Sequence, residues 1–246
     1  MDNRFVGMLP AELRYELMET EAAIGAPIGV RPLAARDIAL SRRGDVFSIE
    51  TGMERGVYYA NLLVPASQEI EPHVLAHEVM HAHRNLVQSV WRLIDASGEE
   101  RSLPNGIEND LEHLFIIPRE IGYFPEASEY WHREWSCRID NKISCLGATD
   151  QYQKMAARGE AIRLWLTLEQ VMPSHTRRDE LQTAINAAGY SRDASNVIKA
   201  YNRAQPDKLA LAAMAVRFAS LPIHLFAAAR YLPAEHRIEH RNLPAG

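Results

Sequence analysis

The chain has 246 residues, enough to bury a full hydrophobic core as one domain or as a domain with an appendage. Its 27 Lys and Arg residues against 32 Asp and Glu residues give a formal net charge of −5, and no long basic run argues for a nucleic-acid surface. The only two cysteines, Cys137 and Cys145, and the lack of an apolar signal-peptide core near the N-terminus predict a reduced, cytoplasmic protein.

The first third of the chain predicts one helix followed by a small sheet. Residues 10–24 have a helical pattern that Gly25 ends, and residues 28–32 and 45–51 are typical of short strands. A third strand is predicted over 57–64, where β-branched and aromatic side chains are dense.

The next segment contains the most informative motif, His77-Glu78-Val79-Met80-His81. A helix is predicted over 72–94, because Pro72 suits a first helical turn and apolar residues recur at helical spacing. Side chains four residues apart lie on one face of a helix, so His77 and His81 can offer two imidazole nitrogens to one metal ion. Glu78 is then placed to act on a metal-activated water as a general base.

The strand at 57–64, a short loop and the H-E-x-x-H helix together resemble the zincin metallopeptidases. This resemblance covers roughly residues 45–118 and implies a catalytic zinc ion, Zn²⁺, with one position left for water. It also implies that the strand beside the zinc helix is an edge that a peptide substrate can join. From the sequence alone, residues 57–64 are equally compatible with an ordinary strand of the sheet.

A third zinc ligand is expected on the next helix, predicted over 106–117 and stopped by Pro118. The arrangement resembles the gluzincin branch of the zincins, in which a Glu is the third ligand and an Asp four residues later supports a ligand histidine. Glu108 and Glu112 keep this spacing, with Glu in place of Asp. Glu112 is the preferred ligand, because Glu108 could instead close a helical capping box. His113 is a further candidate, as a ligand, as a supporting donor or as an oxyanion donor.

The rest of the chain has a helical pattern, with helices predicted over 127–142, 151–172, 177–188, 192–204 and 207–230. Residues 209–229 are nearly long enough and apolar enough to span a membrane, but they contain Arg217 and Pro222. A buried helix kinked at Pro222, or a buried pair of helices, is therefore the preferred interpretation.

The predicted fold class is α+β, with a small mixed sheet carrying the zinc helix and the second ligand helix, followed by an all-helical C-terminal half. The predicted domains are a zincin-like metallopeptidase domain over 1–124, a helical region over 125–231, and a polar surface tail over 232–246.

The leading functional hypothesis is a zinc-dependent peptidase that acts on a peptide or protein substrate, with no nucleic-acid or membrane partner. His77, His81 and either Glu112 or Glu108 would hold the zinc ion, and Glu78 would be the general base. One alternative is a catalytically inert zincin-like protein that binds zinc as a sensor or adaptor. The other is a structural helical protein in which the H-E-x-x-H motif arose by chance.

Overall fold

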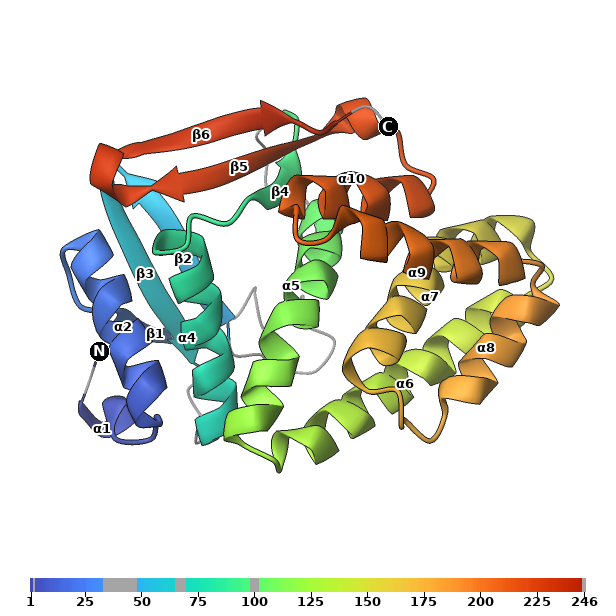
Figure 1. The fold of residues 1–246 in the computed structure, drawn as a ribbon, viewed down its shortest axis with the longest axis horizontal. Helices are drawn as coiled ribbons and strands as arrows, with labels where there is room; N and C mark the ends of the chain where they lie inside the picture. Colours follow the sequence, from blue (N-terminus) through green and yellow to red (C-terminus); the bar gives the residue numbers. More distant parts are fainter. Residues whose placement is uncertain (2, 33–47, 65–69, 98–101, 245–246) are drawn as a thin grey trace. The chain divides into compact units, whose positions relative to one another are not determined.

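A computed structural model describes residues 1, 3–32, 48–64, 70–97 and 102–244 of the chain (Figure 1). The protein is of the mixed α+β class, as predicted. The chain divides into two compact units, one made of residues 1–90 and 230–239 and the other of residues 91–229 and 240–246. The first division falls after Val90, earlier than the domain boundary that the sequence suggested at residue 124.

The first unit is built on a three-stranded sheet in the order β1-β3-β2. Strand β3 (Val57–Val64) pairs in parallel with β1 (Gly29–Pro32) and antiparallel with β2 (Ser48–Glu54). The turn between β2 and β3 places Arg55 and Gly56 at positive φ, as a two-residue hairpin turn requires. The expected strand over 57–64 is therefore present as the central strand of the sheet, and β2 takes the outer position. The expected start of β2 at residue 45 lies outside the described residues.

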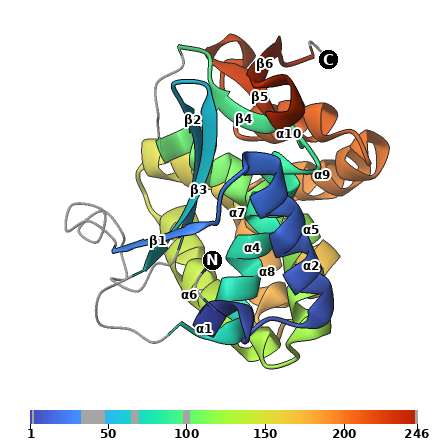
Figure 2. The same ribbon diagram turned by 90° about the vertical axis from the view of Figure 1, so that its left-hand side faces the viewer.

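Two helices pack on this sheet, α2 (Ala11–Ile24) and α4 (Pro72–Leu86), after a short first helix, α1 (Asn3–Val6) (Figure 2). Alternate residues of β3, which include Tyr58, Ala60 and Leu62, are buried, as the two-residue period of a strand requires for a face that packs on helices. Gly25 ends α2 in the left-handed conformation, as predicted.

Helix α4 is shorter than the sequence suggested. It ends at Leu86, and residues 92–94, expected to continue the helix, lie in strand β4 (Arg92–Asp95). This strand pairs antiparallel with residues 226–229, so Leu93 is buried in a sheet instead of on a helical stripe. A pairing so distant in sequence leaves no local signal, which is why apolar spacing alone extended the helix too far.

Helices make up most of the second unit (Figure 1). They are α5 (Ser102–Tyr123), α6 (Ala127–Gly147), α7 (Gln151–Val171), α8 (Arg178–Ala187), α9 (Ser191–Ala204) and α10 (Lys208–Phe218). A large apolar core lies among them and includes Trp135, Ile139, Leu168 and Leu211.

Helix α5 continues through Pro118, where the sequence predicted its end. A proline inside a helix removes one backbone hydrogen bond and costs about 3 kcal/mol. Ile116 and Ile117 before the proline and Glu120 after it are all fully buried. Burial on both sides of Pro118 outweighs the cost of the proline and keeps the helix continuous.

The C-terminal region also differs from its prediction. Helix α10 stops at Phe218, and the chain continues through a short 3₁₀ turn into β5 (Phe226–Leu232) and β6 (Arg237–Asn242), where a kinked helix and a polar tail were expected. Strands β4, β5 and β6 form the second sheet, in that order. Across the described ranges, no helix combines the length and apolar character needed to cross a membrane.

Candidate metal centre

Helix α4 presents two histidines to the same side. Pro72 occupies its first turn, where a missing N–H costs nothing, and the apolar residues Leu75, Val79 and Ala82 are fully buried. His77 and His81 lie one turn apart, with ring centroids 4.8 Å apart and nearly perpendicular planes. The predicted pairing of these two side chains on one helical face is confirmed.

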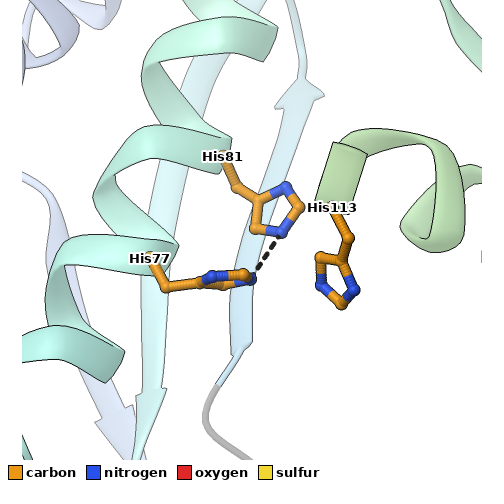
Figure 3. Close-up of side chains that lie close together, drawn as sticks. All are labelled: His77, His81 and His113. Atoms are coloured by element: carbon orange, nitrogen blue, oxygen red, sulfur yellow. Dashed lines mark hydrogen bonds between the residues drawn. The ribbon is translucent and has the colours of Figure 1, made fainter. Parts of the chain in front are cut away.

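The geometry of the histidine pair fits a metal ion. The Nε2 atoms of His77 and His81 are 3.1 Å apart, so one ring donates a hydrogen bond to the other (Figure 3). Two nitrogen ligands at about 2.0–2.1 Å from a tetrahedral zinc ion lie roughly 3.3 Å apart. A metal ion could therefore replace the shared proton with little movement of either ring.

His113, on α5, completes a group of three imidazoles (Figure 3). His77, His81 and His113 each offer one ring nitrogen, and these three atoms all lie within 4.8 Å of one another. His113 is 7% exposed and packs edge-on against Trp131, with ring centroids 5.0 Å apart. The indole N–H of Trp131 in turn donates to the carboxylate of Glu120 at 2.9 Å, which restrains the ring beside His113. This group of three histidines could hold a metal ion.

Glu78 is buried beside the histidine pair and is held by the sheet. Its Oε2 atom accepts a hydrogen bond of 2.8 Å from the main-chain N–H of Ile49, in β2. A carboxylate is costly to bury unless charged or polar groups satisfy it, and this amide supplies one such partner. The sequence had given no sign of Ile49 as a neighbour of the motif, since strand pairing and helix docking bring the two together.

Glu108 and Glu112, the carboxylates expected as third ligands, both contact a lysine. Lys208, in the first turn of α10, donates to Glu108 at 2.8 Å and also to Glu112, and all three side chains are buried. The second oxygen of Glu108 accepts from the main-chain N–H of Leu93 at 2.8 Å. The group of three imidazoles does not include Glu108 or Glu112. A buried carboxylate needs a partner, and here the structure provides an ammonium group.

Sequence reasoning missed Lys208, although one signal was present. Lys208 directly precedes the apolar residues 209–213. A lysine in such a position is costly to bury without an opposite charge. Its partners are on α5, about a hundred residues earlier in the chain. The sequence could therefore indicate that Lys208 needs an anion, but not which one.

A second buried charge cluster lies in the helical unit. Asp110, on α5, accepts hydrogen bonds from Arg138 at 2.9 Å and from Arg163 at 2.8 Å. Burial by itself raises the pKa of Asp110, but the two guanidinium groups outweigh that effect and lower the pKa to about 2. This carboxylate is therefore a structural anion.

The remaining buried histidines have other partners. His73 contacts Glu71 at 2.7 Å and His83 contacts Glu19 at 3.1 Å, and both histidines are buried. His175 stacks on His132 with centroids 4.1 Å apart. Burial lowers the pKa of His175, and its Nε2 contacts the carbonyl oxygen of His132 at 3.1 Å.

Comparisons with known proteins add no relative: no protein-family model, curated protein or solved structure matches this chain. The resemblance to the zincins therefore rests only on the sequence pattern of the strand, the loop and the H-E-x-x-H helix.

Proposed function

We propose that this protein is a zinc-dependent peptidase whose metal centre is built on His77 and His81, with Glu78 as the general base. The observation that carries the proposal is the arrangement on α4. Two imidazole nitrogens lie 3.1 Å apart, and the next residue after the first histidine is a buried carboxylate. That combination suits a metal that activates water and a base that accepts its proton.

For the third ligand, we propose His113. Its ring nitrogen belongs to the same group as those of His77 and His81, whereas Glu108 and Glu112 share the ammonium group of Lys208. Three neutral imidazoles with one remaining position form a donor set that zinc uses in catalytic sites. Glu112, then Glu108, are the next candidates, each of which would have to give up its contact with Lys208.

Within this proposal, each residue of the chain has a separate task. A bound zinc ion supplies the Lewis acidity that activates water and polarises a carbonyl group. His77, His81 and His113 hold the ion through nitrogen atoms that must be unprotonated. Glu78 accepts a proton on its carboxylate and returns it to the leaving amine of the peptide.

The test compares wild type with Glu78→Gln on a broad peptide library, read by mass spectrometry in the presence of one equivalent of zinc. Gln keeps an oxygen that can accept from Ile49 and loses only the ability to take a proton. We expect normal zinc content and a loss of hydrolysis of at least about a hundredfold. Glu129→Gln, at an exposed position of α6, is the matched control and should keep full activity.

A second candidate function is a zinc-binding sensor or adaptor that does not cleave peptides. The bond from Ile49 to Glu78 favours it, because a carboxylate that ties a helix to a strand has a structural use without catalysis. Zinc-loaded wild type that cleaves nothing beyond the Glu78→Gln background would select this function. Protein that neither contains zinc nor takes it up would exclude both.

A further inference from the structure

The outer edge of β2 makes two hydrogen bonds to side chains from other elements of the first unit. The N–H of Ile49 donates to Glu78 on α4, and the carbonyl oxygen of Thr51 accepts from the hydroxyl of Tyr231 at 3.1 Å. In an antiparallel pair, the N–H and C=O of alternate residues point away from the partner strand. Ile49 and Thr51 are two residues apart and pair with Leu62 and Ala60 of β3, so both present their polar groups to the same outer side.

The bond from Ile49 constrains the carboxylate of Glu78. A hydrogen bond from an amide to an ionised carboxylate is charge-assisted and therefore shorter and stronger than a neutral one. It engages Oε2 of Glu78, at 2.8 Å, and so limits rotation of the carboxylate about its last torsion angle. The main chain of β2 thereby sets which oxygen of Glu78 turns toward the sheet.

Tyr231 keeps that strand in place. Its hydroxyl holds Thr51, and its ring packs edge-on against Tyr58 of β3 with centroids 5.5 Å apart. Tyr58 also donates through its hydroxyl to the carbonyl oxygen of Arg237 and accepts from the N–H of Leu232 at 3.2 Å. The hairpin residues 230–239 thus fix β2 two residues away from the amide that contacts Glu78.

We propose that Ile49 is a positioning residue whose main-chain N–H orients the Glu78 carboxylate for proton transfer through its other oxygen, Oε1. This inference rests on the proposed peptidase function. Correct orientation of a reacting group can contribute a large part of a rate, and a misplacement of about 1 Å can cost up to about a hundredfold. Ile49 contacts neither substrate nor metal in this proposal and acts only through Glu78.

The first experiment removes the N–H with Ile49→Pro. The lost donor points away from β3, so the bonds between β2 and β3 remain, and prolines are tolerated at such outer positions. We expect kcat to fall about tenfold or more, with KM and zinc content within about twofold of wild type. Ile49→Ala keeps the N–H and should retain kcat. Met53→Pro, two residues beyond Thr51 on the same side, is the control for a proline in β2.

A merely structural bond would give a different pattern. Ile49→Pro would then lower the free energy of unfolding but leave kcat of the folded protein unchanged, and that result would overturn the inference. A loss of kcat as large in Met53→Pro as in Ile49→Pro would also overturn it, because the effect would belong to the strand as a whole. Active wild type combined with either result leaves the proposed peptidase function intact.

The second experiment does not depend on activity. Amide hydrogen exchange of wild type should show Ile49 protected, with protection lost by about tenfold or more in Glu78→Ala and largely kept in Glu78→Gln. Protection at Ile49 that is equal in Glu78→Ala and wild type would overturn the inference. Wild type that cleaves no peptide would instead overturn the proposed function and, with it, the positioning role.

Discussion

The ammonium group of Lys208 donates to the carboxylate of Glu112 inside the helical unit, and both side chains are almost fully buried. Glu108 shares the same ammonium group at 2.8 Å, so two carboxylates contact one cation. Helix α10 is joined to α5 by these contacts, one helical turn apart on α5. Removal of the cation would leave two like charges together in the core.

The first prediction follows from that arrangement. Lys208→Met should lower the free energy of unfolding by about 3–5 kcal/mol at pH 7, because breaking a buried ion pair leaves an uncompensated charge. Urea unfolding followed by circular dichroism measures this loss. Lys199→Met, at an exposed position of α9, should change stability by less than about 0.5 kcal/mol. Similar stability for the two variants would contradict the structural role of Lys208.

The second prediction concerns metal content. Purified wild type, dialysed against micromolar zinc and then against buffer, should hold close to one zinc ion per chain, whereas His77→Ala and His81→Ala should hold almost none. Elemental analysis measures the ratio directly. His224→Ala removes an exposed histidine and should retain the metal. If the His77→Ala protein keeps its zinc, the ion is bound elsewhere.

The third prediction distinguishes the candidates for the third ligand. Because the imidazole of His113 lies in the histidine group, His113→Ala should weaken zinc binding by about a hundredfold, and Glu112→Gln and Glu108→Gln by less than about tenfold. Competition with a chromophoric chelator gives the three affinities. The reverse order, with Glu112→Gln the weakest binder, would establish a glutamate ligand. Its contact with Lys208 would then have to be lost when the metal binds.

The fourth prediction concerns acid stability. The pKa of Asp110 is lowered to about 2 in the folded protein, below its ordinary value of 3.8, so its contribution to stability is complete above about pH 4 and is lost as the pH falls through 2. Asp110→Asn removes this contribution. The difference in unfolding free energy between wild type and Asp110→Asn should therefore shrink by about 2 kcal/mol between pH 5 and pH 2. Urea unfolding of both proteins at several pH values tests it, and a constant difference would contradict the ion pair.

The sequence predicted the parts of the site that depend on local spacing. His77 and His81 lie on one helix because their separation matches one turn, and Pro72 marks where that helix begins. His113 could be named only as one of several candidates, because its place beside the pair depends on tertiary packing. Ile49, which contacts Glu78, and Lys208, which contacts Glu112, come from elements that no local pattern connects to these carboxylates.

Contacts between residues far apart in the sequence also explain the errors in the predicted fold. Residues 92–94 were expected to continue a helix on the strength of apolar spacing, but they pair with β5 more than a hundred residues later. Residues 226–229 belong to an apolar run whose length suggested a helix, but they form the first part of β5. Pro118 was expected to stop its helix, but α5 continues through it, because its neighbours on both sides are buried.

The assignment of residues 230–239 to the first compact unit has a consequence for synthesis on the ribosome. The chain emerges N-terminus first, so β3 and Tyr58 leave the ribosome long before Tyr231 and Arg237, their partners in that unit, have been made. At about 5–20 residues per second, this delay is roughly 10–35 seconds. During that time the carbonyl oxygen of Thr51, on the outer edge of β2, lacks its hydrogen bond from Tyr231. Residues 230–239, which are translated long after β3, therefore complete the part of the fold that was begun first.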